Sequence, residues 1–79
     1  MAPTPLSRPS RMVLKLALET QRPLDVATVS DQLGFSAIQA ESELRELTGH
    51  GYLREAGGRF ALEEHRAPEA RQAAMLQVQ

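Results

Sequence analysis

Few residues of this 79-residue chain have the type and spacing that catalysis or metal binding requires. The sequence contains no cysteine, so it has neither a disulfide framework nor a thiolate metal site. Its two histidines, His50 and His65, lie fifteen positions apart and have no ligand-like partner nearby. No nucleophile, base and orienting group can be assembled from local spacings. The sequence therefore predicts no catalytic residue, no metal and no cofactor.

The polar residues between positions 36 and 46 have spacings that are typical of an exposed helix. Ser36 and Gln39 match a capping box, in which each side chain bonds the other residue's backbone N–H. Glu41 and Arg45 lie four apart, an ion-pair spacing worth only roughly 0.2–0.5 kcal/mol on an exposed helix. These side chains can cap a helix and form its solvent-exposed face, and they are also candidates for binding a partner.

The first third of the chain predicts a leader and then a strongly apolar helix. Residues 1–8 are rich in proline and small polar residues, which bury little apolar surface, so we expect them to be disordered. A helix should begin near Pro9 or Ser10, capped by Ser7 or Ser10, and end around Gln21, because Pro23 disfavours helical geometry at the residue before it. Two apolar stripes make it the expected central helix: Met12, Val13, Leu16 and Ala17 in one, Leu14 and Leu18 in the other.

Two further helices should flank a short turn. Asp25 can cap a helix over residues 26–33, and Gly34 supplies the left-handed conformation that closes it. Ser36 can then cap a helix over residues 37–48. The apolar positions of both helices recur three and four apart, which places them on one face of each: Val26, Val29 and Leu33, then Ala40, Leu44 and Leu47. This is the layout of a helix-turn-helix.

The residues after this helix pair predict a β-hairpin. Two short runs, 52–55 and 59–62, flank Ala56-Gly57-Gly58, and the glycines supply the positive φ that such a turn needs. Alternation along the two strands directs three side chains toward the core: Leu53, Phe60 and Leu62. Leu24, isolated upstream, leaves room for at most a very short strand.

The tail, residues 63–79, has a weaker pattern. Ala67-Pro68-Glu69 is a helix-start signal, and alanines follow at helical spacing. An alanine-rich helix of about ten residues is marginal alone. It could dock on the first helix or pair with the same helix of a second chain, and a disordered end is the third alternative.

Length and charge limit the function classes further. One domain is expected, and a domain this small buries only roughly 60% of its unfolded surface, which disfavours a deep catalytic cleft. The formal net charge is −1, yet residues 25–49 hold five acidic side chains against Arg45 alone. The longest apolar run, residues 73–76, is far shorter than the roughly 20 residues of a membrane span. Without a signal-peptide pattern either, we expect a cytoplasmic protein with no membrane partner.

The expected element order is that of a winged helix: a helix, a short strand, two helices around a turn, and then a hairpin. The sequence Leu33-Gly-Phe-Ser36, with Leu44 and Leu47, Gly51-Tyr-Leu53 and Gly58-Arg-Phe60, resembles the winged helix-turn-helix regulators of bacteria. The resemblance covers roughly residues 9–62. It implies a mainly α (α+β) fold with a three-helix core, a two-stranded C-terminal wing and a possible fourth helix.

The resemblance implies a DNA-binding transcriptional regulator. The helix over residues 37–48 would enter the major groove, and the wing over residues 54–59 would reach the backbone. Carried onto this chain, the DNA-binding residues would be Ser36, Gln39, Ser42, Arg45, Arg54, Gly58 and Arg59. Gln39 could pair with adenine, and Arg45 could contact guanine or a phosphate. A homodimer through the first helix or the tail would match two DNA half-sites.

An alternative function follows from the acidic character of the third helix. Glu41, Glu43 and Glu46 accompany Arg45, and each carboxylate near phosphates lowers the affinity for DNA. The domain could instead be a protein-interaction or assembly module whose partner has a basic surface. In size and layout the chain is similar to the small winged helix proteins that accompany bacterial ferrous-iron transporters, although their cysteine-rich wing is absent here.

Overall fold

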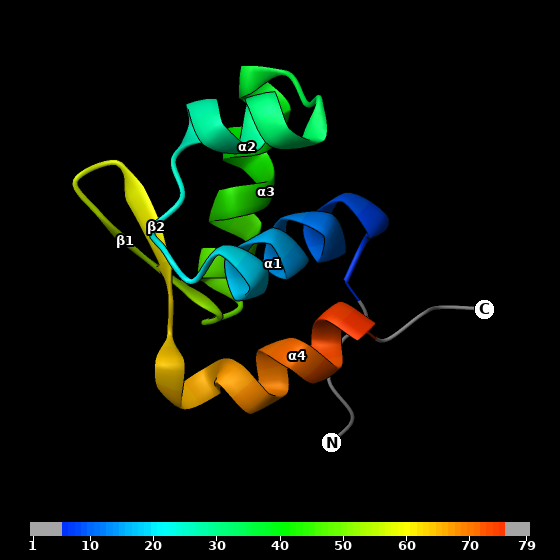
Figure 1. Ribbon diagram of the computed structural model, residues 1–79, viewed down its shortest axis with the longest axis vertical. Helices are drawn as coiled ribbons and strands as arrows, with labels where there is room; N and C mark the ends of the chain where they lie inside the picture. The colour runs from blue at the N-terminus through cyan, green and yellow to red at the C-terminus, as the bar shows by residue number, and fades with distance from the viewer. Residues whose placement is uncertain (1–5, 76–79) are drawn as a thin grey trace.

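The computed structural model describes residues 6–75 and places three helices before a small antiparallel hairpin and a fourth helix after it (Figure 1). The elements are α1 (Arg8–Thr20), α2 (Val26–Leu33), α3 (Ala37–Gly49), β1 (Leu53–Ala56), β2 (Arg59–Leu62), the 3-10 helix η1 (Glu64–Arg66) and α4 (Ala67–Met75). The mainly α fold class predicted from the sequence, including its fourth helix, is confirmed.

Side-chain caps fix where the helices begin. The Asp25 carboxylate accepts a 2.7 Å hydrogen bond from the N–H of Thr28 and starts α2 at the predicted residue. Gly34, with φ of 71°, ends α2 in the left-handed conformation that glycine adopts without Cβ strain. The Ser36 hydroxyl accepts a 3.1 Å hydrogen bond from the N–H of Gln39 and starts α3. These caps act between near neighbours in sequence, so they could be predicted from it.

The predicted disordered leader extends too far along the chain. Leu6 is buried in the core with 4% of its surface exposed, and its carbonyl accepts a hydrogen bond from the Arg11 guanidinium. Ser7 caps α1 by accepting from the N–H of Ser10, and Arg8 is the first residue of the helix. The leader prediction is therefore wrong for residues 6–8, because Leu6 finds apolar partners. Residues 1–5 lie outside the described residues.

The core forms around α1, which packs against α3, α4, α2 and β2. Its buried apolar side chains come from all four α-helices, both strands and the segments between them: Leu6, Val13, Leu14, Ala17, Leu24, Val29, Ala40, Leu44, Leu47, Tyr52, Leu53, Phe60, Ala70, Ala73 and Ala74. Met12, expected on an apolar stripe of α1, is exposed because the buried face of the helix centres on Ser10, Val13, Leu14 and Ala17. The central position of α1 is as predicted.

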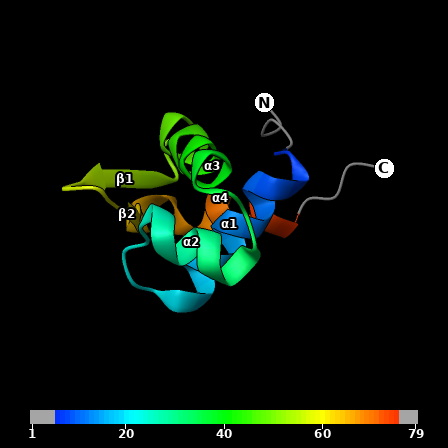
Figure 2. The same cartoon turned by 90° about the horizontal axis from the view of Figure 1, so that it is seen from above.

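The hairpin closes through a two-residue turn. Ala56 pairs with Arg59, and Gly57 and Gly58 between them have φ of 60° and 80°, which matches the twist of tight hairpin turns. The backbone of Leu24 exchanges two 2.7 Å hydrogen bonds with Phe60, so the position that left room for at most a very short strand forms a single β-bridge. Figure 2 shows the hairpin extending beyond the helices, with β1 on the side of α3.

The last helix returns beneath α1 (Figure 1). Ala70, Ala73 and Ala74 form its buried face, so of the three alternatives for the tail the structure shows docking on the first helix. At the turn that precedes it, the guanidinium carbon of Arg66 lies 5.1 Å from the ring centroid of buried Tyr52, a cation–π contact. Residues 76–79 lie outside the described residues. Within 6–75, no helix is both long and apolar enough to cross a membrane.

Candidate nucleic-acid interface

One face of α3 is left free by the way the helix packs. Its fully buried residues, Ala40, Leu44 and Leu47, all point toward the core. Residues three and four apart share a helix face, so these three lie on one side of α3. The opposite side is exposed to solvent. We call it the outer face of α3; its exposed residues are Ile38, Gln39, Glu41, Ser42, Arg45, Glu46 and Gly49.

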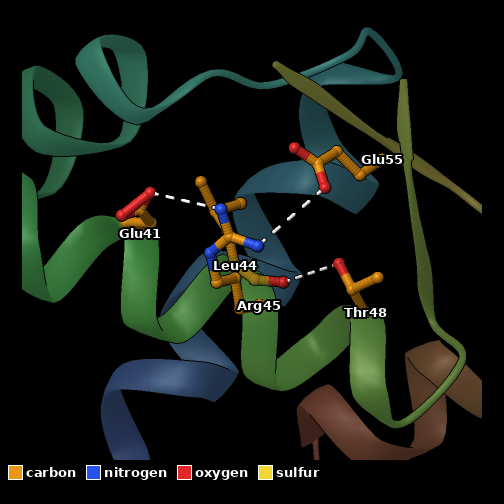
Figure 3. Close-up of polar contacts among 5 residues, drawn as sticks. All are labelled: Glu41, Leu44, Arg45, Thr48 and Glu55. Atoms are coloured by element: carbon orange, nitrogen blue, oxygen red, sulfur yellow. Dashed lines mark hydrogen bonds and ion pairs between the residues drawn. The ribbon is translucent and has the colours of Figure 1, made fainter. Parts of the chain in front are cut away.

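Arg45 is held between two carboxylates. Its Nη2 lies 3.4 Å from Oε1 of Glu41 on the same helix, and its Nη1 lies 4.0 Å from Oε1 of Glu55 on β1 (Figure 3). Because all three side chains are exposed, these ion pairs add little to stability. The pairs matter for the surface charge, because Arg45 is the only arginine or lysine of α3 and its charge is offset by two carboxylates. The pair with Glu55 also links α3 to the hairpin.

The two hairpin arginines differ in their surroundings. Arg54, on β1, forms a 2.8 Å ion pair with Glu63, which follows β2. Arg59 is exposed beside the turn, and no carboxylate of residues 6–75 lies within 4.0 Å of it. Arg59 is therefore the hairpin cation most available to an external anion. Gly58 beside it adopts positive φ and shapes the turn.

The Arg59 charge is also felt by Asp25, at the start of α2. Hydrogen bonds from the Thr28 hydroxyl and then from the Thr28 N–H hold the pKa of the Asp25 carboxyl below its ordinary value of 3.8, with a smaller contribution from Arg59. The cap of α2 is thus held mainly by Thr28, and Arg59 adds only a minor electrostatic contribution.

Glu43 does not belong to the outer face. It is half-buried, and its Oε1 accepts a 2.8 Å hydrogen bond from the hydroxyl of Ser10, a residue of α1 that is only 1% exposed. The prediction that Glu43 adds to the exposed charge of this helix is therefore wrong, and the approach of Glu55 to Arg45 from β1 was not predicted. Across the outer face and hairpin, three arginines are thus balanced by three glutamates: Arg45, Arg54 and Arg59, and Glu41, Glu46 and Glu55.

The predicted DNA-binding residues at the start of α3 differ in whether their side chains are already used within the domain. The Ser36 hydroxyl is used as the cap of α3, as the capping interpretation expected. The side-chain amide of Gln39 is exposed and makes no hydrogen bond within residues 6–75, so only one half of the capping box is formed there. Ser42 and Arg45 line a shallow surface depression together with Glu46, Gly49 and His50.

Ile38 is an exposed apolar residue of α3 that was not predicted as a site residue. Its side chain is 84% exposed at the start of the outer face, between Ala37 and Gln39. A signal for it exists in the sequence: Ile38 is apolar, yet it falls outside the stripe of Ala40, Leu44 and Leu47. The structure thus places Ile38, Gln39, Ser42 and Arg45 on one exposed helix face, with the hairpin beside it (Figure 2).

The order of the elements indicates the type of fold. Three helices, a two-stranded antiparallel hairpin and a fourth helix, with Leu24 paired to Phe60, are consistent with a winged-helix-like fold. Comparisons with known protein families, with curated proteins and with solved structures found no match to this chain. Within residues 6–75, no group of three or more His, Asp or Glu side chains could hold a metal ion.

Proposed function

We propose that this protein is a small DNA-binding transcriptional regulator that places α3 in the major groove and the hairpin, residues 54–59, along the DNA backbone. The observation that carries the proposal is the free outer face of α3 with an arginine-bearing hairpin at its side. The major groove of B-DNA is wide enough for one α-helix, and a hairpin beside that helix can reach phosphates.

The surface charge predicts weak binding by a single copy. Phosphate contacts supply most of the nonspecific affinity, and here three arginines face three glutamates. Arg59 is the cation best placed for a first phosphate contact because it has no ion-pair partner among residues 6–75. A homodimer would double the number of such contacts and match two half-sites.

The test is a titration of a mixed-sequence duplex with full-length protein, followed by fluorescence anisotropy from about 50 to about 200 mM salt. We expect micromolar binding at the lowest salt that weakens steeply as salt rises. The double variant Arg54→Glu with Arg59→Glu should weaken binding about tenfold or more.

The matched control is Arg8→Glu with Lys15→Glu. It makes the same charge change on two exposed residues of α1, which belong neither to the outer face nor to the hairpin. It should weaken binding much less than the hairpin variant. Equal losses would show that the hairpin makes no specific contact, and no binding at the lowest salt would overturn the proposal. Light scattering on the same samples gives the oligomeric state.

The neutralised Arg45 favours a second candidate function. A helix whose only exposed cation is engaged by Glu41 and Glu55 suits a partner protein with a basic surface as well as it suits DNA. In that function the domain would be an interaction or assembly module without DNA binding. The two functions differ in the anisotropy experiment, because the module would leave the duplex unbound even at low salt.

A further inference from the structure

The side chains at the start of the outer face of α3 differ from those that usually read guanine. Arginine and lysine are the common partners of the O6 and N7 atoms of guanine in the major groove. Among residues 6–75, Arg45 is the only arginine or lysine of α3, and it lies between Glu41 and Glu55. Using it for a base contact would separate it from both carboxylates and bring them close to the DNA.

Gln39 and Ile38, the free side chains at the start of the outer face, match the chemical groups of an A·T pair. The amide of Gln39 is exposed and without a hydrogen bond in the described part of the chain, and glutamine can bond N6 and N7 of adenine together. Ile38, 84% exposed, offers an apolar surface, and the 5-methyl group of thymine is the apolar feature of the major groove.

The position of Ile38 matters more than its exposure. Single exposed apolar residues are common on protein surfaces and need no explanation by themselves. Met75, 77% exposed at the end of α4, is such a residue. Ile38 instead lies in the first turn of α3, next to Gln39 and one turn before Ser42, where a helix that enters the major groove by its N-terminal end meets base edges.

We propose that the outer face of α3 recognises A·T base pairs, with Ile38 against the 5-methyl group of thymine and Gln39 on adenine. This inference rests on the proposed DNA-binding function and adds the class of sequence that the protein selects. Neither Ile38 nor Gln39 takes part in the ion pairs that Arg45 forms with Glu41 and Glu55.

The experiment begins with selection of duplexes from a random pool by the full-length protein. We expect enrichment of a site that contains A·T pairs. Each thymine of the selected site is then replaced in turn by deoxyuridine, which removes only the 5-methyl group. At one position the replacement should weaken binding about threefold to fivefold, the effect expected for one buried methyl-sized group.

Variants assign the effect to Ile38. Ile38→Ala should bind the thymine and deoxyuridine duplexes equally, and its circular dichroism should match the wild type because the side chain is outside the core. Met75→Ala is the control: it truncates a similarly exposed apolar residue on α4 and should keep the thymine preference.

The outcomes separate this inference from the proposed function. Absence of binding to any duplex at low salt overturns both. Binding without an enriched sequence, enrichment of G·C pairs, or equal affinity for thymine and deoxyuridine at every position overturns the A·T inference and leaves DNA binding standing. A thymine preference that survives in Ile38→Ala overturns the role of Ile38. A change of oligomeric state in Ile38→Ala without a change in base preference assigns Ile38 to a protein contact and overturns its role as well.

Discussion

The hydroxyl of Ser10 in α1 donates a 2.8 Å hydrogen bond to the carboxylate of Glu43 in α3. Ser10 is almost fully buried, and its Oγ also accepts a 3.1 Å hydrogen bond from the hydroxyl of Ser7. These hydrogen bonds join α3 to α1. They also keep Glu43, one of the four charged side chains of α3, away from the outer face. The same contact therefore positions the candidate interface and reduces its negative charge.

Removing the Ser10 hydroxyl should destabilise the domain. Hydrogen bonds to charged groups contribute roughly 1.5–3 kcal/mol, and Ser10→Ala leaves the half-buried carboxylate of Glu43 without this donor. We expect a loss of that size in the free energy of unfolding, measured by urea denaturation. Ser42→Ala, on the exposed face of α3, is the control and should change stability by no more than about 0.5 kcal/mol. Equal effects of the two variants would contradict the assigned contact.

Releasing Arg45 should strengthen DNA binding if the proposed function is correct. The double variant Glu41→Gln with Glu55→Gln removes both carboxylates that neutralise Arg45. We expect tighter binding and a log–log salt slope that is steeper by about one phosphate contact, measured by anisotropy.

The control for this variant has the same charge change elsewhere. Glu64→Gln with Glu69→Gln removes two exposed carboxylates, of which Glu69 pairs with Arg66 at 3.1 Å. It should leave the salt slope unchanged. If both double variants steepen the slope equally, net charge alone accounts for the result and Arg45 makes no phosphate contact.

The cap of α2 should make stability depend on acid pH. Hydrogen bonds from the hydroxyl and N–H of Thr28 lower the folded-state pKa of Asp25 below 3.8, so the ionised carboxylate stabilises the folded state. This stabilisation is present above the unfolded-state pKa and is lost as pH falls through the folded-state pKa.

Asp25→Asn provides the measurement. Asparagine keeps a cap acceptor but does not titrate, so the urea midpoint of the variant should fall less than that of the wild type between about pH 7 and about pH 3. An equal fall in the two proteins would show that Asp25 contributes nothing to the acid sensitivity.

The docking of α4 on α1 can be tested by placing a charge in their contact. Ala70 is fully buried on α4, so Ala70→Asp would bury an unpaired carboxylate and should cost about 3 kcal/mol or more in urea denaturation. Gln72→Asp introduces the same charge on the exposed side of α4 and should have an effect near zero. If Ala70→Asp is equally mild, α4 does not stay docked in solution.

The helix starts and the hairpin turn could be predicted from the sequence because the interactions that create them are local. Asp25 and Ser36 bond backbone groups three residues ahead, and Gly34, Gly57 and Gly58 occupy positive-φ positions that few other residues tolerate. The apolar spacing of three and four likewise identified the buried face of α3. These patterns determined the order of the elements and most of their bounds to within one residue; the first hairpin strand, for example, was predicted over 52–55 and is Leu53–Ala56.

The composition of the candidate site was decided by tertiary structure. Ser10 and Glu43 are 33 positions apart, and Arg45 meets Glu55 only because β1 folds back along α3. Sequence spacing identified the Glu41 pair within one helix but carries no information on how two helices or a helix and a strand cross. The sequence by itself thus determined the elements and their buried faces, whereas packing between elements decided which charges are neutralised and which side chains, Ile38 and Gln39 among them, stay free.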